Sequence, residues 1–180
     1  MAKRVRAYVG LGANVGDARG NLHRAIRGLA ALPGVRVTGV SRLYRTKPVG
    51  VINQADFLNA VAALDVPAGP DPHTGALALL VALKELEHAI GRQPGQRWGP
   101  REIDLDLLVF GRHLINVERP EGRWLVVPHP LARERQFVLA PLADLAPGLR
   151  PPGWGESVAS ARARAHQAEP DDAVQVVGKL

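Results

Sequence analysis

The stretch best suited to chemistry is Ile103-Asp104-Leu105-Asp106-Leu107, in which acidic and aliphatic residues alternate. Successive side chains of a β-strand point to opposite faces, so this alternation predicts a strand with both carboxylates on one face. Their Cα atoms are then about 7 Å apart, because each residue advances about 3.3 Å. Mg²⁺ takes one or two protein carboxylates and keeps its other positions for water and substrate phosphates. We therefore predict that Asp104 and Asp106 are metal ligands.

The run before this strand, Arg97-Trp98-Gly99-Pro100-Arg101, supplies the opposite charge. Guanidinium groups beside a metal are a common apparatus for stabilising polyphosphate oxygens. The combination predicts chemistry on a triphosphate. The pattern alone also fits two simpler interpretations: a solvated acidic face, or structural ion pairs between the arginines and neighbouring acids.

A second candidate site lies on the strand expected over residues 56–66, where Phe57 and Asn59 share a face. An aromatic ring can stack on a planar heterocycle while an amide two residues away hydrogen-bonds its edge. The alternative for Phe57 is a position in the hydrophobic core.

Glycines 10, 12 and 16 fall between a strand and a helix, as they do in phosphate-binding loops. Their spacing is not Gly-x-Gly-x-x-Gly, and no Gly-Lys-Ser/Thr follows. We interpret them as a tight strand-to-helix turn.

The remaining patterns outline the elements that must position these residues. Strands are expected at 7–11, 35–44, 56–66, 103–110 and 124–127, and helices at 18–32, 75–90 and 156–167. Polar loops are expected at 45–55 and 116–123, and a linker at 67–74. Residues 137–145 are expected to form either a short helix or an apolar segment. Residues 169–180 are expected to form either a mobile tail or an added edge strand. Two long helices interleaved with strands predict an α+β sandwich in which helices cover a mostly antiparallel sheet.

Composition narrows the class of protein. The 180 residues suit one domain, and the net charge of +6 with a pI near 10.5 favours an anionic partner. Aromatic residues make up only 4%, which argues against a surface that stacks many bases. The chain has no cysteine, no apolar run near the ~20 residues that span a bilayer, and a start unlike a secretory signal. We expect a cytoplasmic protein.

Several blocks occur in a recognisable order: Gly10-Leu11-Gly12-Ala13-Asn14, Tyr44-Arg45-Thr46, Phe57-Leu58-Asn59, Arg97-Trp98-Gly99-Pro100-Arg101-Glu102-Ile103-Asp104-Leu105-Asp106 and Val127-Pro128-His129-Pro130. Together they make the chain resemble the 6-hydroxymethyl-7,8-dihydropterin pyrophosphokinase family of folate biosynthesis, from Tyr8 to about Pro147. The resemblance implies a ferredoxin-like α/β sandwich. It also implies one pyrophosphokinase domain over residues 1–150, with a C-terminal helix and tail over 151–180 that packs on or trails this domain. We expect a monomer.

The same resemblance implies a reaction in which ATP gives its β,γ-pyrophosphoryl unit to the hydroxymethyl oxygen of the pterin and releases AMP. Two Mg²⁺ ions would be held by Asp104 and Asp106, with Arg97 and Arg101 as further catalytic residues. ATP and pterin would be the partners, without nucleic acid or membrane. The implied ATP site comprises Leu80, Glu87, Arg92, Arg97, Trp98, Arg101, Leu107, His129 and Arg135. The implied pterin site comprises Thr46, Val49, Phe57, Asn59, Asp104 and Phe137.

The chain departs from the family pattern at three places. The loop Gln93-Pro94-Gly95-Gln96 is less basic than in relatives, and Lys47 stands where proline is common. Residues 120–124 are interpreted as an insertion near another nucleotide contact, which either Arg119 or Arg123 would supply. None of these changes touches the acidic pair.

Two rival functions remain open on the residues alone. A metal-dependent nucleotidyltransferase would direct attack at Pα and release pyrophosphate, whereas attack at Pβ releases AMP. A non-catalytic basic RNA-binding module is favoured by the pI and opposed by the few aromatics and the paired acids.

Overall fold

A computed structural model of the chain describes residues 3–50, 53–95, 98–120, 122–168 and 173–180. The elements before the acidic strand are β1 (Arg4–Ala13), α1 (Ala18–Ala31), β2 (Arg36–Val40), β3 (Arg42–Thr46), β4 (Phe57–Pro67) and α2 (Pro72–Ile90). The acidic strand is β5 (Asp104–Phe110), and β6 (Ile115–Arg119), β7 (Gly122–Val127), a 3-10 turn (Ala132–Glu134), α3 (Gln136–Leu145), α4 (Val158–His166) and β8 (Val174–Lys179) follow.

The main sheet has the strand order β5-β1-β4-β3-β8, and β2 also pairs with β4. Every pairing in it is antiparallel. The central strands β1 and β4 lie between β5 on one side and β2 and β3 on the other, with α1 and α2 as the crossovers. This is the ferredoxin-like order, and the predicted fold class is confirmed.

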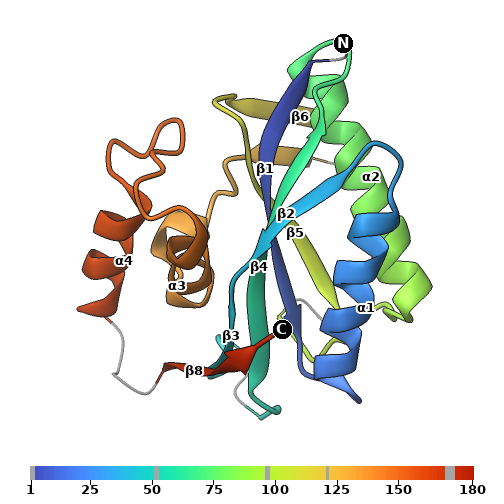
Figure 1. Cartoon of the computed structure of the whole chain (residues 1–180). Helices are drawn as coiled ribbons and strands as arrows, with labels where there is room; N and C mark the ends of the chain where they lie inside the picture. Colours follow the sequence, from blue (N-terminus) through green and yellow to red (C-terminus); the bar gives the residue numbers. More distant parts are fainter. Residues whose placement is uncertain (1–2, 51–52, 96–97, 121, 169–172) are drawn as a thin grey trace.

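Helices cover both faces of the sheet, with α1 and α2 on one side and α3 and α4 on the other (Figure 1). Leu22, Leu83 and Leu105 belong to the core beneath α1 and α2. Val61 and Leu139 belong to the core beneath α3 and α4. Because both faces are covered, β4 is buried along most of its length, which explains its nearly continuous apolar sequence.

Helix α2 begins earlier than the pattern predicts, and the linker is correspondingly shorter. The Asp71 carboxylate accepts hydrogen bonds from the backbone N–H groups of His73 and Thr74, at 2.9 and 3.0 Å. Pro72 occupies the first turn, where its missing N–H costs nothing. At the other end Gly91 adopts a φ of 111° and caps the helix, as expected.

Two predicted segments are wrong in detail. The strand expected over 35–44 is broken at Ser41, whose hydroxyl accepts the Val61 N–H at 2.9 Å, so β2 and β3 are separate strands. The polar loop expected over 116–123 is mostly a hairpin of β6 and β7, because Val117 packs on the core between polar neighbours. Of the two alternatives for the C-terminal tail, the added edge strand is the one present: β8 pairs antiparallel with β3 at the edge of the sheet.

The tight-turn interpretation of the first two glycines is also wrong. Gly10 and Gly12 lie inside β1, where Gly10 is opposite Val61 of β4 and Asp106 of β5. Gly12 is opposite Asn59 on one side and Asp104 on the other.

Candidate active site

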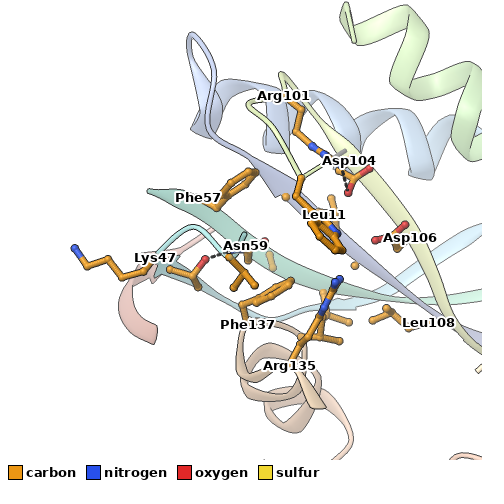
Figure 2. Close-up of a pocket in the computed structure, with 18 residues that line it drawn as sticks. Leu11, Lys47, Phe57, Asn59, Arg101, Asp104, Asp106, Leu108, Arg135 and Phe137 are labelled. Carbon is orange, nitrogen blue, oxygen red and sulfur yellow. Dashed lines mark hydrogen bonds and ion pairs between the residues drawn. The ribbon is translucent and has the colours of Figure 1, made fainter. Parts of the chain in front are cut away.

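A pocket opens where β1, β4 and β5 meet the N-terminal end of α3 (Figure 2). It brings together most of the residues that the sequence nominated for pterin, metal and phosphate. Those that line it are Thr46, Val49, Phe57, Asn59, Trp98, Arg101, Asp104, Asp106, Arg135 and Phe137. Segments from opposite ends of the chain therefore contribute to one cavity.

Strand β1 contributes Gly10, Leu11 and Gly12 to the pocket, and the two glycines have no side chain. A Cβ atom on Gly12 would lie 2.8 Å from Asn59 Oδ1, closer than such atoms approach. A Cβ atom on Gly10 would meet only Leu108 methyl groups at 3.5 Å, an ordinary contact. Gly12 thus leaves room for the amide of β4 beside the acids of β5.

Both oxygens of Asp104 are engaged by guanidinium groups. Arg92 Nη1 lies 2.6 Å from Asp104 Oδ1, and Arg101 Nη1 lies 3.0 Å from Asp104 Oδ2. Arg92 Nη1 also contacts Glu87 Oε2 at 2.5 Å. Of the structural ion pairs considered from the sequence, the one between Arg101 and Asp104 is present, and both residues line the pocket. The pairs made by Arg92 were not predicted.

Asp106 has a different environment. Burial, together with the neighbouring negative charge of Asp104, raises its pKa to about 6, although Lys84 and Arg135 act in the opposite direction. The carboxyl therefore titrates nearer to neutrality than an ordinary aspartic acid.

The acidic pair fits a hard divalent cation. Within the described residues no group of three or more His, Cys, Asp or Glu side chains is placed to enclose a metal. Two carboxylates on one face of β5 instead suit Mg²⁺, which completes its coordination with water and phosphate oxygens.

The opposite end of the pocket is flat and apolar with one amide. Phe57 from β4 and Phe137 from α3 lie on either side of the cavity, and Asn59 lies between them (Figure 2). The Asn59 Nδ2 group donates to Thr46 Oγ1 at 2.6 Å, which fixes the amide. The Arg135 guanidinium lies 5.4 Å from the centre of the Phe137 ring.

Asn14, at the end of β1, joins the two loops that border the pocket. Its Nδ2 donates to Gln54 Oε1 at 3.0 Å and to the Ala55 carbonyl at 2.9 Å. Its Oδ1 accepts the Arg101 N–H at 2.9 Å. Gln54 Nε2 in turn donates to the Trp98 carbonyl at 2.8 Å. No role for Asn14 was predicted, because these contacts depend on how distant loops meet.

His129 follows β7 and is neutral at pH 7, because burial and the nearby Arg135 lower its pKa. The Leu131 N–H donates to His129 Nδ1 at 3.3 Å. The proton of the neutral ring is therefore on Nε2, which can donate a hydrogen bond.

A second groove lies between α2 and β7. It is lined by Leu80, Val81, Lys84, Glu85, His88 and Trp124. Lys84 Nζ donates to the Leu105 carbonyl at 3.1 Å, so the groove adjoins the acidic strand. Neither Lys84 nor Trp124 was predicted as a site residue. The sequence signal that could have indicated Trp124 is the position of an aromatic residue directly after the polar segment 116–123.

Other predicted residues lie apart from the main pocket. Leu80 lines the second groove, whereas Leu107 is buried in the core with α2. Glu87 is buried beneath β5, where its Oε1 accepts the Leu105 N–H at 2.6 Å. Arg97 lies outside the described residues, as do the side chains of Arg119 and Arg123. No helix in the described ranges has the length and apolar character to cross a membrane.

Comparison with known proteins identifies relatives of the chain. The family model for 7,8-dihydro-6-hydroxymethylpterin-pyrophosphokinase matches residues 8–147. A Methylorubrum extorquens protein named 2-amino-4-hydroxy-6-hydroxymethyldihydropteridine pyrophosphokinase is 45% identical over 144 residues, which cover 80% of this chain and 84% of the relative. A Pseudomonas aeruginosa protein of the same name is 44% identical over 147 residues, covering 82% and 84%.

Solved structures with the same fold include a Plasmodium falciparum HPPK-DHPS crystallised with pteroate. The TM-score is 0.74 at 14% identity, and the match covers 97% of this chain and 47% of that one. The chain thus spans about half the length of the solved chains it matches. At this identity the likeness shows the fold alone.

Proposed function

The chain belongs to the 7,8-dihydro-6-hydroxymethylpterin-pyrophosphokinase family, and we propose that its main pocket carries out the transfer for which that family is named. It is an ATP-dependent pyrophosphokinase of folate biosynthesis. The hydroxymethyl oxygen of the pterin forms a bond to Pβ of ATP, and the bond from Pβ to the oxygen bridging to Pα breaks. AMP leaves, and the hydroxyl proton is lost. The family match favours neither rival function.

One observation supports the assignment of this pocket above the others. The gap between two phenylalanine rings, which suits a flat ring, lies in the same cavity as two aspartates and several positively charged side chains. Phe57 and Phe137 would stack on the two faces of the pterin. The Asn59 carbonyl oxygen would accept from its amino group, with Thr46 holding the amide in place. An analogue without these polar groups would leave the buried amide unpaired and would bind poorly.

The other end of the pocket would hold the triphosphate. Asp104 and Asp106 would hold Mg²⁺, and we propose two ions as in the family pattern. Bound Mg²⁺ would neutralise the charge of the transferred group and align it with the attacking oxygen. Arg101 and Arg135 would donate to phosphate oxygens from the same pocket, and His129 would donate through Nε2. The chain's contribution is positioning and electrostatic stabilisation.

The groove between α2 and β7 would receive the nucleoside. Trp124, 36% exposed, offers a ring for the purine, and Leu80 offers an apolar wall. Lys84 belongs to this groove and also acts electrostatically on Asp106, so it lies along the path from base to acids. A nucleotide would thus reach from Trp124 past Lys84 to the acidic pair.

We propose a monomer. We also propose a cytoplasmic location, since ATP is an intracellular metabolite.

The products of the reaction test the proposal. Purified protein is incubated with ATP, Mg²⁺ and 6-hydroxymethyl-7,8-dihydropterin, and the nucleotides and pterins are separated by chromatography. AMP and a pterin diphosphate in equal amounts are expected. Pyrophosphate without AMP would instead indicate nucleotidyl transfer, and salt-sensitive RNA retention by a protein without turnover would indicate the RNA-binding module.

A further inference from the structure

The carboxylate of Asp104 is held by two arginines at once. Arg92 takes one oxygen at 2.6 Å and Arg101 takes the other at 3.0 Å. The Asp104 side chain is only 24% exposed, so the two guanidinium groups occupy much of the space around it. The Arg101 contact is drawn in Figure 2.

Each arginine has a second attachment that does not involve Asp104. Arg92 contacts Glu87, which is buried and fixed to the Leu105 N–H. Arg101 donates from Nε to the Gly99 carbonyl at 3.2 Å, and its backbone is tied to Asn14. Each arginine would therefore keep a partner close to Asp104 if its bond to Asp104 broke.

The bonds to Asp104 compete with metal binding. A carboxylate oxygen that accepts a charged hydrogen bond has less electron density to offer a cation, and the guanidinium charge repels that cation. Phosphate oxygens are equally good partners for arginine, because they accept charged hydrogen bonds in the same forked geometry.

We propose that Arg92 and Arg101 occupy Asp104 until the nucleotide arrives and then exchange it for phosphate oxygens, which frees Asp104 for the metal. This proposal rests on the proposed function in one respect, the assignment of Asp104 as a metal ligand. The exchange couples the binding of metal to the binding of nucleotide. Metal alone must displace the arginines from Asp104 without offering them a new partner, whereas the nucleotide offers them its phosphate oxygens. By reciprocity, each ligand strengthens the binding of the other.

Mn²⁺ is the probe for a direct test, because free Mn²⁺ can be counted by electron paramagnetic resonance without any turnover. The nucleotide-free affinity is measured for the wild type, for Arg92→Gln, for Arg101→Gln and for the double variant. The matched control is Lys84→Gln, which removes a positive charge near Asp106 but no contact to Asp104. Thermal denaturation verifies the fold, and the single variants serve if the double variant is unfolded.

We expect the double variant to bind Mn²⁺ about 10-fold more tightly than the wild type, within the usual range of coupling between sites. The control should change less than about twofold, since Lys84 donates to Glu87 and to the Leu105 carbonyl rather than to Asp104. In an Asp104→Asn background the arginine changes should have no effect. Arginine variants that bind Mn²⁺ no more tightly than the control would overturn the exchange.

A second measurement separates this proposal from the assignment beneath it. Calorimetric titration with α,β-methylene-ATP, with and without Mg²⁺, compares the wild type with Asp104→Asn. Metal-dependent nucleotide binding that is lost in Asp104→Asn supports Asp104 as a ligand. If the metal dependence is unchanged in that variant, the metal assignment itself is wrong, and the exchange is overturned with it.

Discussion

Asp104 and Asp106 occupy equivalent positions on one face of β5 yet meet different surroundings. Asp104 pairs with Arg92 and Arg101, whereas Asp106 is buried and lies in the electrostatic field of Asp104, Lys84 and Arg135. Two carboxylates so placed can bind the same metal ion while differing in how readily each accepts a proton. The predictions at this scale follow from that difference.

Replacing either acid should abolish most turnover. Asp104→Ala and Asp106→Ala remove the oxygens assigned to the metal, and we expect AMP formation to fall by about 10³-fold or more. Circular dichroism should show an intact fold, since both side chains face the pocket. Normal turnover by Asp106→Ala would contradict the assignment.

Asp106 should make the metal-free protein less stable as the pH rises. Its pKa in the folded state, about 6, lies above the ordinary value near 3.9, so the native protein binds a proton that the unfolded chain releases. Stability is therefore lost between about pH 4 and pH 6, and the loss is complete above that window. In EDTA, Asp106→Asn should raise the Tm at pH 8 and leave it nearly unchanged at pH 4. An equal shift at both pH values would mean that titration of Asp106 is not the cause.

At the scale of elements, β1 lies in the sheet between β4, which carries Phe57 and Asn59, and β5, which carries the two acids. Its glycines place Asn59 and Asp104 across one bare stretch of backbone. The sheet register, rather than any loop, sets the spacing between Asn59 and Asp104.

Gly12→Ala should disturb pterin binding. Its Cβ would lie 2.8 Å from Asn59 Oδ1 and force the amide to move, so we expect the KM for the pterin to rise about 10-fold or more with the fold retained. Gly10→Ala is the matched control, because its Cβ makes only ordinary contacts. Steady-state kinetics on both variants would decide, and similar KM values for the two would refute this account of Gly12.

Helix α2 is attached to β5 through Glu87. Its carboxylate accepts the Leu105 N–H and contacts Lys84 and Arg92, all from a buried position. Glu87→Ala leaves these groups without their acceptor, and we expect a loss of about 2–3 kcal/mol of unfolding free energy. Glu85→Ala, an exposed site on the same helix, should change it by less than about 0.5 kcal/mol. Urea denaturation of both variants provides the comparison, and equal losses would exclude the attachment.

At the scale of the whole molecule, the last strand supports the pocket from the sheet edge. β8 pairs with β3 up to Thr46, and the Lys47 N–H donates to the Ala173 carbonyl at 3.1 Å. Both Thr46 and Lys47 line the pocket, at the end proposed for the pterin. The C-terminal segment thus reaches the site through β3.

Deleting residues 173–180 should raise the KM for the pterin more than the KM for ATP, because only the pterin end loses its support. Kinetics with each substrate varied in turn would measure this. A deletion that affects both constants equally, or neither, would contradict a local role for β8.

The sequence predicted those parts of the site that repeat within one element. Alternation placed Asp104 and Asp106 on one face, and the same rule joined Phe57 to Asn59. It did not predict Lys84, it placed Gly12 in a turn, and it named Glu87 for the ATP site rather than for the contact with β5, because these roles depend on which residue of a distant strand lies opposite. Asn14 was missed for the same reason, since its partners come from two loops more than 35 residues away.

The most direct test is a crystal of the protein with Mn²⁺, the pterin and α,β-methylene-ATP, in which the bond that would break is replaced by a methylene bridge. The anomalous signal of Mn²⁺ locates the metal. The account predicts metal at about 2.0–2.2 Å from carboxylate oxygens of both Asp104 and Asp106, with Arg92 and Arg101 on phosphate oxygens. Metal bound elsewhere, with Asp104 still paired to both arginines, would contradict it.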